Sequence, residues 1–167
     1  MTASIQKLPP QNIEAEQAVL AGILLDNAAI NRVLEVMQPD DFYKEVHRKI
    51  FLGMTYLSET NEGIDLISLP ECLSKKGFLE AIGGVSYLTD IMNSVATAAN
   101  IHYHAKIVHE KALLRQLIHT ATDIVTQGFE DREGAGVANL LDYAEKSIFG
   151  ISEARIRATF VPMKELG

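Results

Sequence analysis

The chain has little of several features that mark common protein classes. Among its 167 residues there is one cysteine, Cys72, and no tryptophan. A single cysteine excludes an internal disulfide framework and is typical of proteins of the reducing cytosol. No apolar run approaches the roughly 20 residues that a membrane helix needs, and the N-terminal segment MTASIQKLPPQ lacks the apolar stretch of a signal peptide. We therefore expect a cytoplasmic protein without a membrane segment.

Positive charge is also scarce. Fifteen Lys and Arg residues stand against 22 Asp and Glu residues, which gives a net charge of −7. Duplex binding depends on basic side chains that neutralise phosphates, and single-strand binding depends on basic residues interleaved with aromatic ones. The stretch with most aromatic residues, 42–56, contains only Lys44, Arg48 and Lys49 as basic residues. Direct binding of nucleic acid by this chain is therefore not expected.

The motifs of common catalytic and nucleotide sites are absent. The sequence contains no GxxxxGK[ST], GxGxxG, HExxH or CxxC pattern. Asp40 and Asp41 follow Pro39 and fit a turn better than an acid–base pair. Cys72 has no histidine beside it and fits a small core residue. We therefore predict that this chain has no catalytic, cofactor-binding or metal-binding residues and is not itself an enzyme.

Four of the five histidines fall in one long predicted helix. They are His102, His104, His109 and His119. His102 and His109 nearly share a helix face, but no third ligand lies three or four residues away to complete a metal site. We predict that these histidines are exposed residues on the helix surface.

Helical periodicity dominates the sequence, and residues 12–96 predict five short helices around one core. Asn12 can cap the first helix. A third helix over about 44–60 places apolar residues and one histidine on the same side, namely His47, Ile50, Phe51, Met54 and Leu57. Ser68 and Glu71 form a candidate capping box for a short helix that Gly77 ends, and Gly83-Gly84 precedes another amphipathic helix. The fold class predicted is all-α, with a compact multi-helix head.

A long antiparallel helical hairpin is predicted after the head. Thr97 can cap a helix that meets no Gly or Pro until Gly128, a rod of roughly 45 Å at 1.5 Å per residue. Its first half is expected to pack on the head and its second half to project. A glycine-rich turn follows over 128–136, and a returning helix has near-heptad apolar residues at Val137, Leu140, Leu141, Ala144, Ile148 and Ile151.

The predicted organisation is a tail, a head, a hairpin and the start of a linker, over residues 1–11, 12–96, 97–153 and 154–167. The residues 160–166 read as the first turn of a further element, which suggests the N-terminal piece of a longer protein. The apolar stripe from Leu113 to Val125 is wider than one returning helix can cover, so we expect the hairpin to be an assembly surface. The alternative, that residues 1–95 fold back over this stripe, stays open.

Several segments together resemble one family. The N-terminal domain of bacterial replicative DNA helicases of the DnaB type has the same motifs in the same order, over about residues 8–157 here. The segments that carry the resemblance are LPPQNIEAEQAVL (8–20), DFY (41–43), HRKIF (47–51), IDLI (64–67), IGGVSYL (82–88) and AANI (98–101).

The resemblance implies the N-terminal collar domain of a hexameric, ring-shaped helicase. In this family the collar domains pair through their hairpins into a trimer of dimers. A linker helix docks on the neighbouring subunit and leads to a RecA-like motor, which binds ATP and Mg and unwinds duplex DNA at the replication fork in the 5′–3′ direction. No motif of that motor occurs in this chain. Contact with single-stranded DNA is implied only for the full-length ring.

The resemblance also implies partners. The collar recruits the C-terminal helicase-binding domain of primase, and a helicase loader is a further partner. The candidates for primase docking are Tyr87, Ile118 and Ile124. The alternatives left open are that Ile118 faces the partner helix of the hairpin and that Tyr87 packs in the head.

A second set of candidates holds the hairpin or a dimer together: Leu113, Leu114, Leu117, Ala121, Leu141 and Ile148. The alternative function is a stand-alone helical adaptor or ligand-binding domain. That function would need a pocket with convergent polar groups, and the sequence shows no sign of one.

Overall fold

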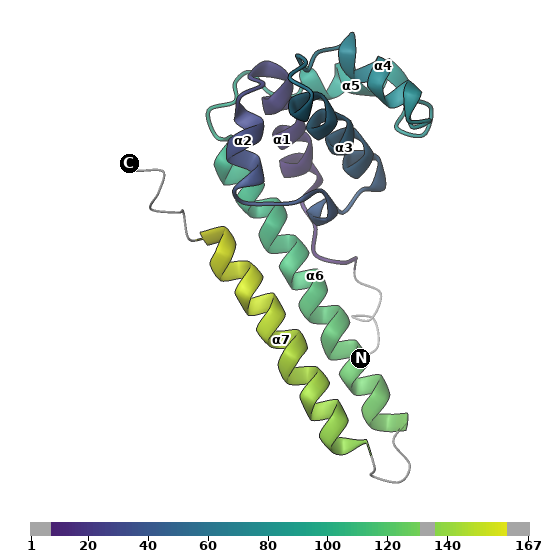
Figure 1. The fold of residues 1–167 in the computed structure, drawn as a ribbon, viewed down its shortest axis with the longest axis vertical. Coiled ribbons are helices and arrows are strands. Elements are labelled where there is room, and N and C mark those ends of the chain that lie inside the picture. The colour runs from purple at the N-terminus through teal and green to yellow at the C-terminus, as the bar shows by residue number, and fades with distance from the viewer. Residues whose placement is uncertain (1–7, 131–135, 160–167) are drawn as a thin grey trace. The chain divides into compact units, whose positions relative to one another are not determined.

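The computed structural model describes residues 8–130 and 136–159, and all regular structure in these ranges is helical (Figure 1). The chain divides into two compact units. Among the described residues, the head comprises Gln11–His109, and the hairpin unit comprises residues 8–10, 110–130 and 136–159. The predicted all-α class is confirmed.

The head contains five α-helices and a short 3-10 turn. The bounds are α1 Ile13–Leu25, α2 Ala29–Leu34, η2 Pro39–Asp41, α3 Glu45–Glu59, α4 Ser68–Lys75 and α5 Gly84–Met92. Several predicted signals act as expected. Asn12 caps α1 by accepting a hydrogen bond from the Ala15 amide at 2.9 Å. Gly77 takes a positive φ of 77° directly after the end of α4, where a glycine avoids the clash of a side chain.

The predicted capping box of Ser68 and Glu71 does not form. The cap of α4 lies one turn earlier, at Asp65. The Asp65 carboxylate accepts the amides of Ile67 and Ser68, and the Ser68 hydroxyl accepts the amide of Asp65. Glu71 instead pairs with Lys75 on the exposed side of the helix. Asp65 acts as the cap in place of Glu71 because it precedes the helix and reaches two amides that have no partner within the helix. The hydrogen bond from the Ser68 amide lowers the pKa of Asp65 most, and the one from the Ile67 amide lowers it further.

The core of the head is apolar and continuous. Its largest fully buried side chains come from the helices α1 to α5 and from the segments between them, and the first residues of α6 (Ile101–Glu130) add Ile101, Ala105 and Val108. Burying one such large side chain contributes roughly 1.5–3 kcal/mol. Only three polar residues of the head are buried with them among the described residues, namely Glu16, Asp41 and His47.

The long helix of the hairpin differs from the prediction at both ends. It begins at Ile101, while Thr97 accepts the Ala99 amide in the turn before it. It also continues through Gly128 to Glu130, because one glycine costs a helix only about 1 kcal/mol. The rest of the predicted turn, residues 131–135, lies outside the described residues.

The returning helix, α7, spans Val137–Thr159 and runs antiparallel to α6 (Figure 1). It therefore extends beyond residue 153, where we expected the hairpin to end; the segment 160–166 lies outside the described residues. The Tyr143 hydroxyl donates to the Asp123 carboxylate at 3.0 Å and ties the two helices together. This hydrogen bond raises the pKa of Tyr143.

The near-heptad stripe of α7 divides into two sets. Leu140, Ala144 and Ile151 are half-buried and form the seam of the hairpin. Leu141 and Ile148, which belong to the same predicted stripe, are exposed. The stripe as a whole therefore does not close the hairpin, because it is wider than the seam between two helices.

Candidate functional site

Glu16, His47 and Tyr87 form one hydrogen-bonded chain inside the head. Nδ1 of His47 lies 2.7 Å from a carboxylate oxygen of Glu16, and Nε2 of the same ring lies 2.7 Å from the Tyr87 hydroxyl. The side chains of His47 and Glu16 are 0% and 2% exposed. The chain links α1, α3 and α5, three helices that are distant in the sequence.

Glu16 also holds the start of α3. Its carboxylate accepts the backbone amide of Tyr43 at 2.6 Å and, at 3.4 Å, the amide of Lys44. Lys44 precedes α3 and makes no capping hydrogen bond with its own side chain. A carboxylate at the N-terminal end of a helix is favoured by the helix dipole. Glu16 therefore supplies from α1 the capping group that α3 lacks.

Glu16 fixes the direction of one hydrogen bond of His47. A carboxylate only accepts, so Nδ1 of His47 carries a proton; in the neutral imidazole Nε2 is then the acceptor for the Tyr87 hydroxyl. The side-chain amide of Gln17 donates to the same hydroxyl oxygen at 3.3 Å. The Tyr87 ring lies parallel to the His47 ring, with centroids 5.9 Å apart. The Tyr87 hydroxyl thus both donates and accepts within the head.

The head contains a second pair of a carboxylate and an imidazole, formed by Asp41 and His109. Nδ1 of His109 is 2.8 Å from a carboxylate oxygen of Asp41, and the same oxygen accepts the Gln38 amide. The prediction that the helix histidines are exposed is therefore wrong for His109, which pairs with the buried carboxylate of Asp41, and for His104, which is half-buried. The prediction that Asp41 acts in a turn is confirmed.

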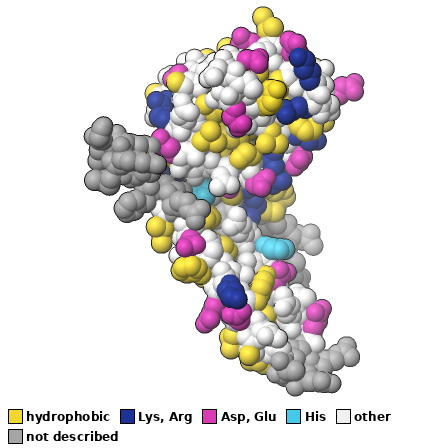
Figure 2. All heavy atoms as spheres, viewed as in Figure 1, with side chains coloured by type: hydrophobic (Ala, Val, Ile, Leu, Met, Phe, Trp, Pro, Cys, Tyr) yellow, Lys and Arg dark blue, Asp and Glu magenta, His cyan; other side chains and the backbone are white. Residues whose placement is uncertain are grey.

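The hairpin unit presents a broad apolar face. At about 100° per residue, Asp123 of α6 and Tyr143 of α7 lie on one side of the seam, where their side chains meet. On each helix one set of exposed apolar residues lies on the other side of the seam, so these two sets adjoin. We call this the hairpin face; it comprises Leu114, Leu117, Ala121 and Val125 of α6 with Val137, Leu141 and Ile148 of α7. Figure 2 shows hydrophobic side chains at the surface along the hairpin.

The three predicted docking residues have different surroundings. Tyr87 is half-buried in the head, with its hydroxyl bound as described. Ile118 is 52% exposed on α6. Ile124 is half-buried, and six residues along a helix turn it about 120° away from Ile118. The structure therefore does not bring Ile118 and Ile124 onto one face of α6.

The six candidates for holding the hairpin or a dimer also separate. Leu113 is buried within the single chain. The other five, all members of the hairpin face, are exposed: Leu114, Leu117, Ala121, Leu141 and Ile148. Because each of these side chains is exposed, all five are available for contact with another molecule.

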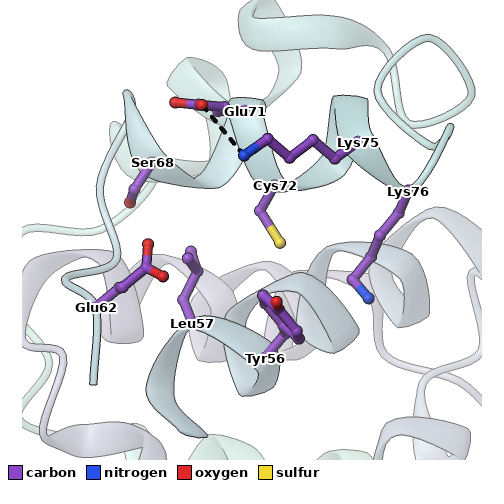
Figure 3. A pocket seen from close by; sticks show the side chains of 8 residues that line it. All are labelled: Tyr56, Leu57, Glu62, Ser68, Glu71, Cys72, Lys75 and Lys76. Carbon is purple, nitrogen blue, oxygen red and sulfur yellow. Dashed lines mark ion pairs between the residues drawn. The ribbon is translucent and has the colours of Figure 1, made fainter. Parts of the chain in front are cut away.

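The head also has a hollow of about 270 Å³ between α3 and α4 (Figure 3). Cys72 points into it from α4 and is buried, as predicted for a small core residue. Burial raises the pKa of the Cys72 thiol, which disfavours the reactive thiolate. At the rim Lys75 pairs with Glu71, and Lys76 lies over the Tyr56 ring. The charged groups are thus engaged with neighbours, and the hollow lacks the constellation of a catalytic site.

Within residues 8–130 and 136–159, no three His, Cys, Asp or Glu side chains lie close enough together to hold a metal ion. None of the helices in these ranges is long and apolar enough to cross a membrane.

The comparisons with known proteins agree with the motifs. The family model described as the DnaB-like helicase N-terminal domain matches residues 8–110. The chain belongs to this family. Among curated relatives, the replicative DNA helicase DnaC of Bacillus subtilis (strain 168) is 47% identical over 96% of this chain and 35% of its own length. The replicative DNA helicase DnaB of Geobacillus stearothermophilus is 42% identical over the same shares. The chain thus spans about a third of the length of these relatives.

Solved structures show the same fold. The N-terminal domain of DnaB helicase from Mycobacterium tuberculosis matches 86% of this chain and 99% of its own, with a TM-score of 0.80 and 41% identity. A DnaB-like replicative helicase whose interactions with primase were described matches 86% of this chain and 31% of its own, with a TM-score of 0.67 and 26% identity.

The fold explains part of this DnaB-like sequence pattern. Glu16 comes from IEAEQ, His47 from HRKIF and Tyr87 from IGGVSYL. Three separated motif segments therefore meet in one hydrogen-bonded chain. The sequence alone did not predict that these three side chains would be in contact. A signal was present, because Glu16 shares a helix face with Leu20 and Ile23. His47 likewise shares a helix face with Ile50 and Phe51. A polar residue on the apolar face of each of two helices was the available signal.

Proposed function

We propose that this DnaB-like N-terminal domain is the non-catalytic collar of a hexameric replicative helicase. It assembles subunits through the hairpin face into dimers and a trimer of dimers, and it docks primase. The full-length protein is an ATP-dependent DNA helicase of the cytoplasm. Its motor domain holds ATP and Mg and contacts single-stranded DNA. This domain supplies the ring contacts and a surface for primase and a helicase loader.

The observation that carries the assembly role is the exposed hairpin face. Seven apolar residues of two helices adjoin on one side of a two-helix unit, and Leu141 alone is 62% exposed. Contiguous apolar surface of this kind marks sites of protein–protein contact. Two such faces brought together by a two-fold axis form a four-helix arrangement, in which each face covers the other.

The docking role is supported by the comparison with a helicase that interacts with primase, combined with the position of two candidates. Ile118 is exposed on α6 beside the hairpin face. Tyr87 is half-buried at the surface of the head. Each candidate is considered within its own unit, and an apolar contact suits a helical partner, which docks by its own apolar face.

A pair of variants tests the face. Leu141→Asp places a charge in the hairpin face, while Phe149→Asp places the same charge on a residue of α7 with a similar exposure, 63%, about 80° away around the helix. Light scattering measures the mass of each variant at a concentration where the wild-type chain is oligomeric. We expect a monomer for Leu141→Asp and the wild-type mass for Phe149→Asp. Equal dissociation of both variants would mean that the hairpin face is not the interface.

A further inference from the structure

The Tyr87 hydroxyl already has two partners within the head. It donates to Nε2 of His47 and accepts from the side-chain amide of Gln17. A phenolic hydroxyl has one proton to donate, and here that proton points inward. What Tyr87 offers to a partner is therefore its ring. Since the ring is half-buried, its orientation decides how much apolar surface a partner meets.

We propose that Glu16 and His47 are positioning residues for docking: they hold the Tyr87 ring in the orientation that primase contacts, and primase binds the ring rather than the hydroxyl. This inference rests on the proposed docking role of Tyr87. Glu16 fixes the proton of His47 on Nδ1, so that Nε2 can accept from the hydroxyl. Neither Glu16 nor His47 is itself exposed to a partner.

Gly83, the residue before α5, fits the same position of Tyr87. Gly83 has a φ of 99°, and a Cβ atom at this position would lie 3.1 Å from Cβ of Tyr87. Any other residue here would meet strain and would press on Tyr87. Gly83 thus leaves the space that Tyr87 occupies, and Tyr87 is held by the parallel ring of His47 and by two hydrogen bonds at its hydroxyl.

The test uses two replacements of His47 that differ in which nitrogen they mimic. An asparagine amide can take the place of Nδ1 and keep the contact with Glu16, but it does not reach Tyr87. A glutamine amide reaches the place of Nε2 and keeps a partner for the Tyr87 hydroxyl. His47→Asn, His47→Gln, Tyr87→Phe and the double variant His47→Asn/Tyr87→Phe are made in the full chain.

Binding is measured by isothermal titration with the C-terminal domain of the primase encoded by the same genome, on protein that circular dichroism shows to be folded. We expect His47→Asn and Tyr87→Phe each to weaken binding by about five- to tenfold, the range for loss of one buried hydrogen bond. The double variant should be no worse than either single one, because both remove the same contact. His47→Gln should restore binding to within about twofold of the wild type.

A matched control removes the other buried carboxylate–imidazole pair. Asp41→Asn disturbs the contact with His109 but does not touch Tyr87, and we expect wild-type binding from it. If binding falls equally in Asp41→Asn, the effect reports the stability of the head and the positioning role is wrong. If Tyr87→Phe weakens binding and His47→Asn does not, primase contacts the hydroxyl directly, which also overturns the inference.

Failure of the proposed function gives a different result. Tyr87→Ala removes the ring altogether; if it binds primase as tightly as the wild type, Tyr87 is not a docking residue and the premise is wrong. If Tyr87→Ala weakens binding while Tyr87→Phe and His47→Asn bind normally, docking at Tyr87 stands and only the positioning role is contradicted. If His47→Asn does not fold, the variant Gln17→Met takes its place in the same comparison, because it removes the other hydrogen bond to the Tyr87 hydroxyl.

Discussion

Glu16 of α1 and His47 of α3 are 31 residues apart in the sequence, yet they share a buried hydrogen bond of 2.7 Å. The same carboxylate accepts the backbone amide of Tyr43 before α3. One side chain thus fixes both the start of a neighbouring helix and the proton of a histidine. A buried carboxylate with these partners is stabilising only while all of them are present.

Glu16→Gln tests the energy of this arrangement. The amide that replaces one oxygen is a donor, so it faces donors and loses the charge-assisted hydrogen bonds. We expect the free energy of unfolding to fall by about 2–4 kcal/mol, measured by urea denaturation with circular dichroism. Glu14→Gln, an exposed change on the same helix, is the control and should cost less than about 1 kcal/mol. Equal stability of the two variants would show that Glu16 does not hold the head together.

Gly83→Ala tests the left-handed turn before α5. The residue has a φ of 99°, and its new Cβ would lie 3.1 Å from Tyr87. Gly77→Ala is the matched control, because Gly77 also has a positive φ, 77°, but nothing within 4 Å of its Cβ position. Each change should destabilise the head by about 1–2 kcal/mol through backbone strain. Thermal denaturation should show a larger loss for Gly83→Ala, and the reverse order would contradict the contact with Tyr87.

Asp65→Ala tests the cap of α4. Two amides lose their acceptor, and we expect a loss of about 0.5–1 kcal/mol at neutral pH. The folded-state pKa of Asp65 lies below its usual 3.8, so the cap stabilises the head above that value and is lost as the pH falls through the folded-state pKa. The difference in stability between wild type and Asp65→Ala should therefore shrink as the pH is lowered below about 4. A difference that stays constant with pH would show that the charge of Asp65 plays no part.

Ile118→Asp and Ile124→Asp separate docking from folding. Ile118 is exposed, so its replacement should leave the melting temperature of the chain unchanged and weaken primase binding about tenfold or more. Ile124 is half-buried, so a charge there should weaken primase binding and also lower the melting temperature of the hairpin. Titration with the primase domain and thermal denaturation are the two measurements. Wild-type binding by either variant removes that residue from the docking surface.

Local patterns predicted most of the fold. The five head helices, the cap at Asn12, the end of α4 at Gly77 and the turn at Gly83 before α5 follow from periodicity and from residues that act on their immediate neighbours. The predicted box of Ser68 and Glu71 was wrong because two overlapping cap signals compete, and the upstream carboxylate of Asp65 reaches more free amides.

The polar interior could not be predicted in the same way. His47 was placed correctly on the apolar side of its helix, but its partners Glu16 and Tyr87 lie 31 and 40 residues away. His109 meets Asp41 across 68 residues. Such pairs depend on how helices pack, and a spacing pattern within one helix carries no information about them.

The hairpin face is the central claim, and the mass of the wild-type chain in solution tests it most directly. Light scattering across a concentration series should show two or more chains per particle, with dissociation on dilution, because two exposed faces cover each other. A mass of one chain at every concentration up to the millimolar range would contradict the claim that this face assembles subunits.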